Sequence, residues 1–298
     1  MRAKRPSWKE ARRRSIDKGG IFVTYNEAKT EGKEFLKAAG IADYEIDAQY
    51  LLEEISGHDR LWFLMNGNEE MSDDEQACYR GLIKTRAEHI PLQHITGRQE
   101  FMGLVFKVTK DVLIPRQDTE ILTELAGGYS AGKDVLDMCT GSGCIAISIK
   151  KLYGAENIVA ADISEPALDV AKENAKENGA DIEFVQSNLF ENITGIYDII
   201  VSNPPYIPTK VIEGLSEEVK VHDPFIALDG MEDGLHFYRE IAEKAPQYLK
   251  SGGRLMFEIG HDQAKAVSGI LAGNGFCNIR VVKDYAGLDR VVHGVKCE

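Results

Sequence analysis

The chain has 298 residues, enough for one large domain and a small one, and 43% of them are hydrophobic, as in an ordinary globular protein. No apolar run approaches the ~20 residues that a membrane-spanning helix needs, and residues 1–20 have no apolar core of a signal peptide. The net charge is −13, yet residues 1–20 hold eight Lys or Arg and two Asp or Glu, which leaves −19 on the remainder and argues against broad binding to a nucleic-acid backbone.

The basic N-terminal segment and the cysteine and histidine content are the next features of the composition. The basic segment 1–22 is interpreted as a disordered extension, in preference to a nucleic-acid tail or a transit peptide. The five cysteines are odd in number and contain no C-x-x-C pair, and the seven histidines show no ligand spacing. We therefore expect a reduced, cytoplasmic protein without a disulfide framework or a metal site.

Residues 23–90 are predicted to form a small helical domain. The spacings Thr24–Glu27 and Ser72–Glu75 are those of capping boxes, which begin helices. Between them, an apolar stripe over 44–55 predicts a further helix. The apolar residues 61–65 are interpreted as a short turn. The bundle contains no catalytic pattern of its own. We interpret it as a substrate-docking domain, with the alternative that it only shields the edge of the sheet.

Residues 91–115 are interpreted as a β-hairpin linker, since 100–108 alternates in polarity around Gly103. From there to residue 298 we expect a catalytic domain in which strands and helices alternate. Strands are predicted at 134–138, 157–161, 182–186, 198–202, 254–258, 276–282 and 290–295. Helices are predicted from about 119 and at 145–152, 165–178, 235–249 and 263–272. This alternation predicts an α/β fold with a doubly wound, mostly parallel sheet of seven strands.

A glycine-rich turn, Cys-Thr-Gly-Ser-Gly at 139–143, follows the first of these strands. Its glycines let the backbone approach a ligand closely and leave helix-start N–H groups available. Asp162 ends the next strand, where a carboxylate can accept both hydroxyls of a ribose. Asn188 follows the third strand and can meet an adenine edge. The turn also fits a loose dinucleotide fingerprint, but no hydride-transfer site follows it.

The fourth strand ends at Asn203-Pro204-Pro205-Tyr206, the most informative stretch of the chain. Each proline fixes its own φ and lacks an N–H donor, so the loop is stiff and presents an amide, carbonyl groups and an aromatic ring. It lies at the carboxyl edge of the predicted sheet, where ligands bind. Such a loop suits the binding of a planar amide or amine.

These motifs together resemble those of class I S-adenosylmethionine-dependent methyltransferases that act on planar nitrogen. The segments Pro91–Gly97, Glu100–Gly103, Val112–Arg116, Ala227–Leu235 and Asp289–Val292 resemble the peptide chain release factor glutamine methyltransferases. The likeness extends from about Tyr25 to the C-terminus. It implies methyl transfer to the glutamine of the Gly-Gly-Gln motif of class-1 release factors, and thereby a role in translation termination.

The resemblance and the residues give one set of expected site residues. Asn203, Pro204 and Tyr206 are expected to be catalytic, and these three with Pro205 to bind the substrate. The expected cofactor-binding residues are Cys139, Thr140, Gly141, Ser142, Gly143, Asp162, Asn188, Leu189 and Asn203. Asn203 Oδ1 and the Pro204 carbonyl are expected to accept the two N–H groups of the target amide, while Tyr206 walls the substrate.

The chain departs from the family pattern at three positions, and three other functions stay open. Cys139 stands where the family usually has glycine, Gln117 where it commonly has proline, and Asn188 where aspartate is frequent. The alternatives are a DNA adenine methyltransferase, a ribosomal-protein glutamine methyltransferase and a non-enzymatic nucleotide-binding module. The acidic body argues against the first, and the stiff tetrapeptide against the last.

Overall fold

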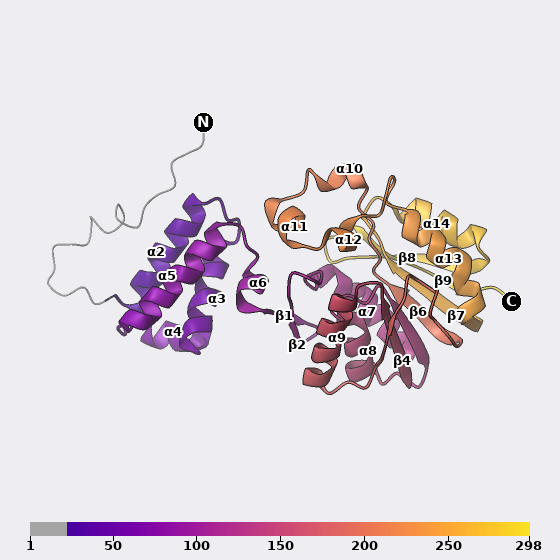
Figure 1. The fold of residues 1–298 in the computed structure, drawn as a ribbon, viewed down its shortest axis with the longest axis horizontal. Coiled ribbons are helices and arrows are strands. Elements are labelled where there is room, and N and C mark those ends of the chain that lie inside the picture. Colours follow the sequence, from indigo (N-terminus) through magenta and orange to yellow (C-terminus); the bar gives the residue numbers. More distant parts are fainter. Residues whose placement is uncertain (1–22) are drawn as a thin grey trace. The chain divides into compact units, whose positions relative to one another are not determined.

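The computed structural model describes residues 23–298, and the chain divides into two compact units that meet between Thr96 and Gly97. The expected extension over 1–22 lies outside the described residues. Each unit is described by itself, and Figure 1 gives the order of the elements along the chain.

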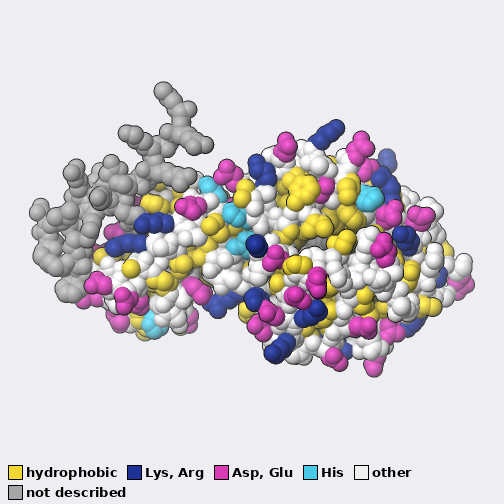
Figure 2. Space-filling view, in the orientation of Figure 1, with side chains coloured by type: hydrophobic (Ala, Val, Ile, Leu, Met, Phe, Trp, Pro, Cys, Tyr) yellow, Lys and Arg dark blue, Asp and Glu magenta, His cyan; other side chains and the backbone are white. Residues whose placement is uncertain are grey.

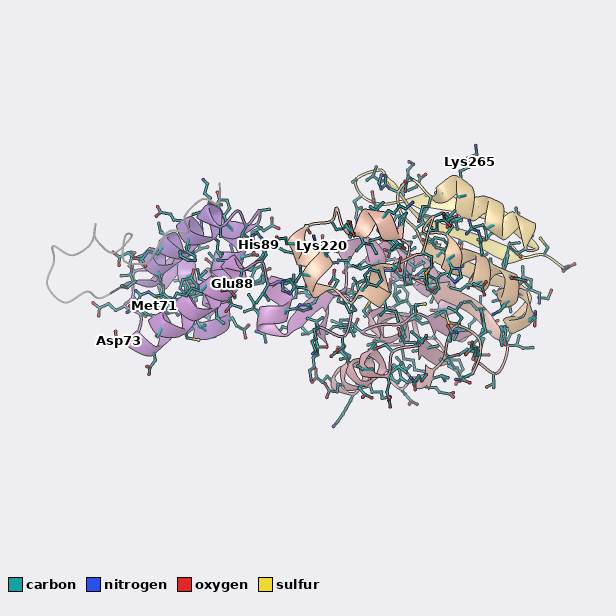
Figure 3. The ribbon with its side chains drawn as sticks, turned by 45° about the horizontal axis from the view of Figure 1, so that its top comes forward. Met71, Asp73, Glu88, His89, Lys220 and Lys265 are labelled. Carbon is teal, nitrogen blue, oxygen red and sulfur yellow. The ribbon has the colours of Figure 1, made fainter. Side chains whose placement is uncertain are left out.

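The first unit is a bundle of helices. They are α2 (Tyr25–Ala38), α3 (Tyr44–Ser56), α4 (Arg60–Asn66), α5 (Asp73–Ala87) and α6 (Leu92–Thr96). Both expected capping boxes form, at Thr24 with Glu27 and at Ser72 with Glu75. In Figure 3, Met71 and Asp73 mark the start of α5, and Glu88 and His89 mark its end.

Residues 61–65 are helical, so the interpretation as a turn is wrong. Asp59 caps α4 by accepting the N–H of Trp62, and this short polar cap lies just before the apolar run. Deeper in the bundle, Arg86 Nε donates to Asp47 Oδ2 at 2.6 Å, and both side chains are buried. A buried ion pair of this kind ties α3 to α5.

The second unit begins with a hairpin, β1 (Arg98–Phe101) and β2 (Leu104–Lys107), whose positive-φ turn contains Met102 and Gly103. The short helix α6 precedes it within the first unit, so residues 91–115 do not form one separate element. The hairpin packs within the second unit, because Phe101 and Phe106 belong to the core beneath α7 and α8.

The remaining strands of the second unit form one sheet. They are β3 (Asp134–Met138), β4 (Asn157–Asp162), β5 (Glu183–Gln186), β6 (Tyr197–Ser202), β7 (Leu249–Glu258), β8 (Phe276–Lys283) and β9 (Asp289–Lys296). Their order is β5-β4-β3-β6-β7-β9-β8, and only β9 pairs antiparallel with its neighbours. The predicted doubly wound, mostly parallel sheet of seven strands is confirmed for the described part of the chain.

Helices cover both faces of this sheet (Figure 1). On one face are α7 (Gln117–Ser130), α8 (Cys144–Tyr153) and α9 (Glu165–Asn178); on the other are α13 (His236–Tyr248) and α14 (Ala264–Gly273). Along β6, Ile199 and Val201 pack beneath the first set, and Ile200 packs beneath the second. This alternation is the period-two pattern of a strand buried on both faces.

The long connection from β6 to α13 carries three short helices. They are α10 (Thr209–Ile212), α11 (Glu217–His222) and α12 (Phe225–Leu228), and Lys220 on α11 is labelled in Figure 3. None of them was predicted from the sequence. No helix among the described residues is long and apolar enough to cross a membrane.

Candidate active site

A cavity of about 320 Å³ lies at the carboxyl edge of the sheet in the second unit. The strand order reverses there, between β3 and β6, which is where open α/β sheets bind ligands. Met138 pairs with Ser202 across these strands, and Ser202 Oγ donates to the Met138 carbonyl at 2.7 Å. The loops that follow the two strands therefore start side by side. Of the expected site residues, those that line the cavity are Cys139, Thr140, Gly141, Ser142, Asp162, Asn188, Leu189, Asn203 and Pro205.

The turn after β3 has a backbone that favours glycine. Gly141 and Gly143 have φ of 55° and 80°. A Cβ on Gly143 would lie 3.0 Å from Ile147 and 3.1 Å from Ala171, so Gly143 allows α8 to start close to α9 and is not among the lining residues. Cys139 has a φ of 62°, which strains an L side chain. This geometry explains why glycine is usual at that position.

Asp162 lies at the end of β4 with each oxygen anchored by the backbone. Its Oδ2 accepts the N–H of Gly141, and its Oδ1 accepts the N–H of Ser164, both at 2.9 Å. Burial raises the pKa of Asp162, and the backbone donors act in the opposite direction. Each carboxylate oxygen has two lone pairs. Both oxygens can therefore accept one more hydrogen bond, as the prediction of two ribose hydroxyls requires.

Asp137 is a residue of this site that the sequence reasoning missed. It is fully buried in β3, and its Oδ2 accepts hydrogen bonds from Thr140 Oγ1 at 2.6 Å and from the Ala146 N–H at 3.2 Å. Burial raises its pKa to about 7, and Oδ1 has no hydrogen-bond partner within residues 23–298. Asp137 thus ties the start of the glycine turn to the first turn of α8. The sequence signal that could have revealed Asp137 is its position as an acidic residue within an apolar strand.

Asn203 lies directly after β6, and its amide group is held from one side. Its Nδ2 donates to Thr119 Oγ1 at 3.2 Å, and both residues line the cavity. Pro204 and Pro205 are both buried, but only Pro205 lines the cavity. Because Nδ2 is engaged with Thr119, Oδ1 is the group of Asn203 that can accept from a ligand.

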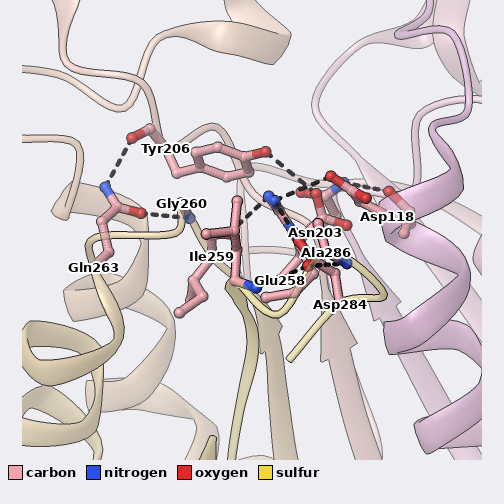
Figure 4. A network of polar contacts seen from close by, with 12 residues as sticks. Asp118, Asn203, Tyr206, Glu258, Ile259, Gly260, Gln263, Asp284 and Ala286 are labelled. Atoms are coloured by element: carbon pink, nitrogen blue, oxygen red, sulfur yellow. Dashed lines mark hydrogen bonds and ion pairs between the residues drawn. The ribbon is translucent and has the colours of Figure 1, made fainter. Parts of the chain in front are cut away.

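Tyr206, which was expected to wall the substrate and not to bind the cofactor, is not among the residues that line this cavity. Its hydroxyl donates to Glu258 Oε1 at 3.3 Å, and its carbonyl accepts from Gln263 Nε2 at 2.9 Å (Figure 4). Burial and the nearby Glu258 raise the pKa of Tyr206 well above its usual value. The side chain is therefore neutral, with its hydroxyl held by Glu258, while Gln263 holds the backbone of the same residue.

An apolar wall over residues 224–237 closes another side of the cavity. Pro224, Ile226 and Met231 line it, and Figure 2 shows apolar side chains gathered on this face of the second unit. Arg116, which also lines the cavity, donates from Nη2 to the buried Asp223 at 2.6 Å. This ion pair ties the start of α7 to the wall. No periodic pattern in the sequence predicted the wall.

Comparisons with known proteins decide the family. A family model described as the PrmC N-terminal domain matches residues 27–97, and the methyltransferase small domain matches residues 118–227. The release factor glutamine methyltransferase of Geobacter sulfurreducens is 42% identical over 264 residues, which cover 87% of this chain and 92% of the relative. That of Agrobacterium fabrum is 40% identical over 283 residues, covering 92% and 98%. The chain belongs to the release factor glutamine methyltransferase family.

A solved structure supports the same fold. A methyltransferase from Pyrococcus furiosus superposes with a TM-score of 0.52 at 17% identity, covering 66% of this chain and 90% of that one. The predicted class I methyltransferase fold is therefore confirmed. The matches in sequence confirm the predicted family of S-adenosylmethionine-dependent enzymes. Within the described residues, no group of three or more His, Cys, Asp or Glu side chains could hold a metal ion.

Proposed function

We propose that this chain transfers a methyl group from S-adenosylmethionine to the side-chain amide nitrogen of a glutamine in a peptide chain release factor. The main support is the position of Asn203, which lines the same cavity as the glycine turn and Asp162. Its Nδ2 is hydrogen bonded to Thr119, so its Oδ1 can accept from a substrate. The names of the relatives support the acceptor, and the resemblance points to the glutamine of the Gly-Gly-Gln loop.

The residues of the cavity fit the methyl donor. Asp162 would accept the ribose hydroxyls through its remaining lone pairs, and the turn 139–143 would lie along the amino-acid part of the cofactor. Leu189 and Asn188 would face the adenine, since both line the cavity after β5. When bound, S-adenosylmethionine supplies an activated methyl group on a sulfonium.

Asn203 and Pro204 would position the acceptor. An amide nitrogen is a poor nucleophile because its lone pair is delocalised, so the protein's main contribution is placement of the reacting atoms about 3–3.5 Å apart. Asn203 Oδ1 would accept one N–H of the glutamine, and the Pro204 carbonyl would accept the other. Two acceptors fix the plane of the –NH₂ group and raise the electron density on nitrogen. The proton can leave after methyl transfer, so no dedicated base is required.

Tyr206 would then act as a wall beside the substrate rather than as part of the cofactor cavity. Its hydroxyl is held by Glu258, which fixes the ring against rotation out of the site. The face of a neutral tyrosine ring attracts nearby positive charge. We assign to it the shielding of the acceptor nitrogen while that nitrogen gains charge.

We also propose a role for the first unit and a cellular location. The helical unit would dock the body of the release factor, because it contains no catalytic group and the chain beyond residue 20 is acidic. All five cysteines are free, which fits a reducing cytoplasm. We do not expect nucleic acid as a partner, given the same acidic balance.

Incubation of the purified protein with isotopically labelled S-adenosylmethionine and a class-1 release factor tests the proposal. Mass spectrometry should locate one methyl group on the side chain of the Gly-Gly-Gln glutamine. Double-stranded DNA offered in parallel should gain no label. Labelled DNA with an unlabelled release factor would contradict the proposal.

A further inference from the structure

Glu258 is a buried carboxyl next to the tetrapeptide, and the proposed chemistry does not use it. It ends β7, whose Phe257 pairs with Ser202 of β6, so it lies at the same level as Asn203. Only 2% of its surface is exposed. Its Oε1 accepts the Tyr206 hydroxyl, while Oε2 has no hydrogen-bond partner within residues 23–298. A carboxyl placed in this way is costly to bury, which suggests a role beyond packing.

Thr119 connects this carboxyl to Asn203. Its side chain is 3% exposed and lies in the first turn of α7. The Thr119 hydroxyl lies beside the Glu258 carboxyl, close enough to favour its charged form, and Thr119 Oγ1 accepts Asn203 Nδ2 at 3.2 Å. The three side chains thus form a short chain of polar contacts that ends at the cavity, and Asn203 and Glu258 are labelled in Figure 4.

The direction of these hydrogen bonds follows from their chemistry. Above its pKa of about 7 the Glu258 carboxyl is ionised and can only accept, so there the neighbouring Thr119 hydroxyl donates its single O–H to it. Thr119 Oγ1 can then offer only its lone pairs to Asn203. The Nδ2 group of Asn203 is the donor that can bond to them. Asn203 Oδ1 must consequently point away from Thr119, toward the place where an N–H donor can approach.

We propose that Glu258 and Thr119 are positioning residues that fix the polarity of the Asn203 amide, so that Oδ1 and not Nδ2 faces the substrate amide. The inference rests on the proposed function, because it gives a reason why the acceptor end of Asn203 meets a glutamine –NH₂ group. If the Asn203 amide could flip by 180°, its Nδ2 would face the –NH₂ group of the substrate for part of the time, and two donors cannot form a hydrogen bond. Turnover would fall although the cofactor cavity was intact.

Burial raises the pKa of Glu258, and its polar neighbours act in the opposite direction. Arg290 lies close enough to favour its charged form, and its Nη2 bridges Asp118 Oδ2 and Asp284 Oδ2, both at 3.0 Å. Tyr206 approaches from the loop after β6. Asp118, Thr119's neighbour on α7, is therefore held to β9 through Arg290, which fixes the start of the helix that carries Thr119.

Substitutions at Thr119 test the inference, because a matched pair and a matched control are available. Thr119→Val removes the hydroxyl and keeps the shape, whereas Thr119→Ser keeps the hydroxyl. Thr123→Val is the control, since Thr123 is also fully buried on α7 and donates only to the Thr119 backbone carbonyl at 3.0 Å. Turnover of a release factor, KM for the release factor, S-adenosylmethionine affinity by calorimetry and thermal midpoint are measured for each.

We expect Thr119→Val to lower kcat about 10- to 100-fold, the size of effect that a small misplacement of reacting groups produces. S-adenosylmethionine affinity should stay close to that of the wild type. Thr119→Ser should recover most of the turnover, and Thr123→Val should keep it. Glu258→Gln, which offers both a donor and an acceptor to Thr119, should also lower kcat. Its effect should not add to that of Thr119→Val in the double variant, because both act on one group.

The outcomes separate the two proposals. Wild-type protein that methylates no release factor refutes the proposed function. Two results with an active wild type would overturn the inference and leave the proposed function standing. In the first, Thr119→Val is as active as the wild type. In the second, Thr119→Ser is as impaired as Thr119→Val. If Thr119→Val does not fold, Glu258→Gln decides alone, and unchanged turnover in that variant also overturns the inference.

Discussion

Replacing Glu258 by glutamine should make the protein more stable and less active. Burial raises the pKa of Glu258 from 4.5 to about 7. The folded state therefore binds this proton more tightly than the unfolded state, and ionising the carboxyl costs stability as pH rises between these two values. Below about 4.5 the carboxyl is protonated in both states, and above about 7 the full cost is present.

The shift of pKa sets the magnitude. A difference of roughly 2.5 units corresponds to about 3 kcal/mol of unfolding free energy at pH 8, and to about 1 kcal/mol at pH 5, where only part of the cost has developed. Glu258→Gln removes the ionisable group. Its advantage over the wild type should therefore be about 3 kcal/mol at pH 8 and shrink by about 2 kcal/mol on going to pH 5.

Urea denaturation at the two pH values measures this difference, through the change in midpoint at a constant slope. Far-ultraviolet circular dichroism is the suitable probe, because both tryptophans, Trp8 and Trp62, lie outside the second unit. Asp137 titrates in both proteins and cancels in the comparison. A stability difference that is the same at pH 5 and pH 8, or a variant less stable than the wild type at pH 8, would refute the reasoning.

Three further substitutions address the cofactor site and the bundle. Asp162→Ala should weaken S-adenosylmethionine binding by about 1.5–3 kcal/mol per charged hydrogen bond lost. Calorimetry measures this change, and an unchanged affinity would show that Asp162 does not bind the cofactor. Cys139→Gly should raise the free energy of unfolding by about 1 kcal/mol, because φ of 62° no longer strains a side chain; a destabilised variant in urea titration would contradict this. Asp47→Ala should lower the stability of the first unit by about 3–5 kcal/mol, because it leaves Arg86 charged in the core. Trp62 fluorescence follows that unit, and a loss below about 1 kcal/mol would show that the ion pair contributes little.

The architecture of the second unit was largely predictable, because its strands are short apolar runs that alternate with longer helical segments. Strand β6 and the turn 139–143 illustrate this, since apolar runs and glycines mark both directly. Helix α4 was not predicted, because the five apolar residues 61–65 are too few to show a helical period and Asp59 alone caps the helix. The helices between β6 and α13 are short, and their formation depends on packing that a single sequence does not reveal.

The site was predictable where a residue type has one evident use. Asn203 and Asp162 stand at strand ends, where polar groups face ligands. Glu258 and Asp137 lie within apolar runs, and their importance comes from burial and from partners distant in sequence. Thr119 shows no signal at all, because an ordinary threonine near a helix start resembles a cap. Tyr206 was expected to wall the substrate, but its hydrogen bond to Glu258 was not predicted, because it depends on how β6 and β7 pair.

The role of Asn203 in methyl transfer can be tested by one comparison. A class-1 release factor is incubated with labelled S-adenosylmethionine and either wild-type protein or Asn203→Ala, and the methyl group is located by mass spectrometry. The account predicts methylation of the Gly-Gly-Gln glutamine by the wild type and nearly none by Asn203→Ala, with cofactor affinity much less affected. Wild-type turnover by Asn203→Ala, or a methyl group on any other side chain, would contradict it.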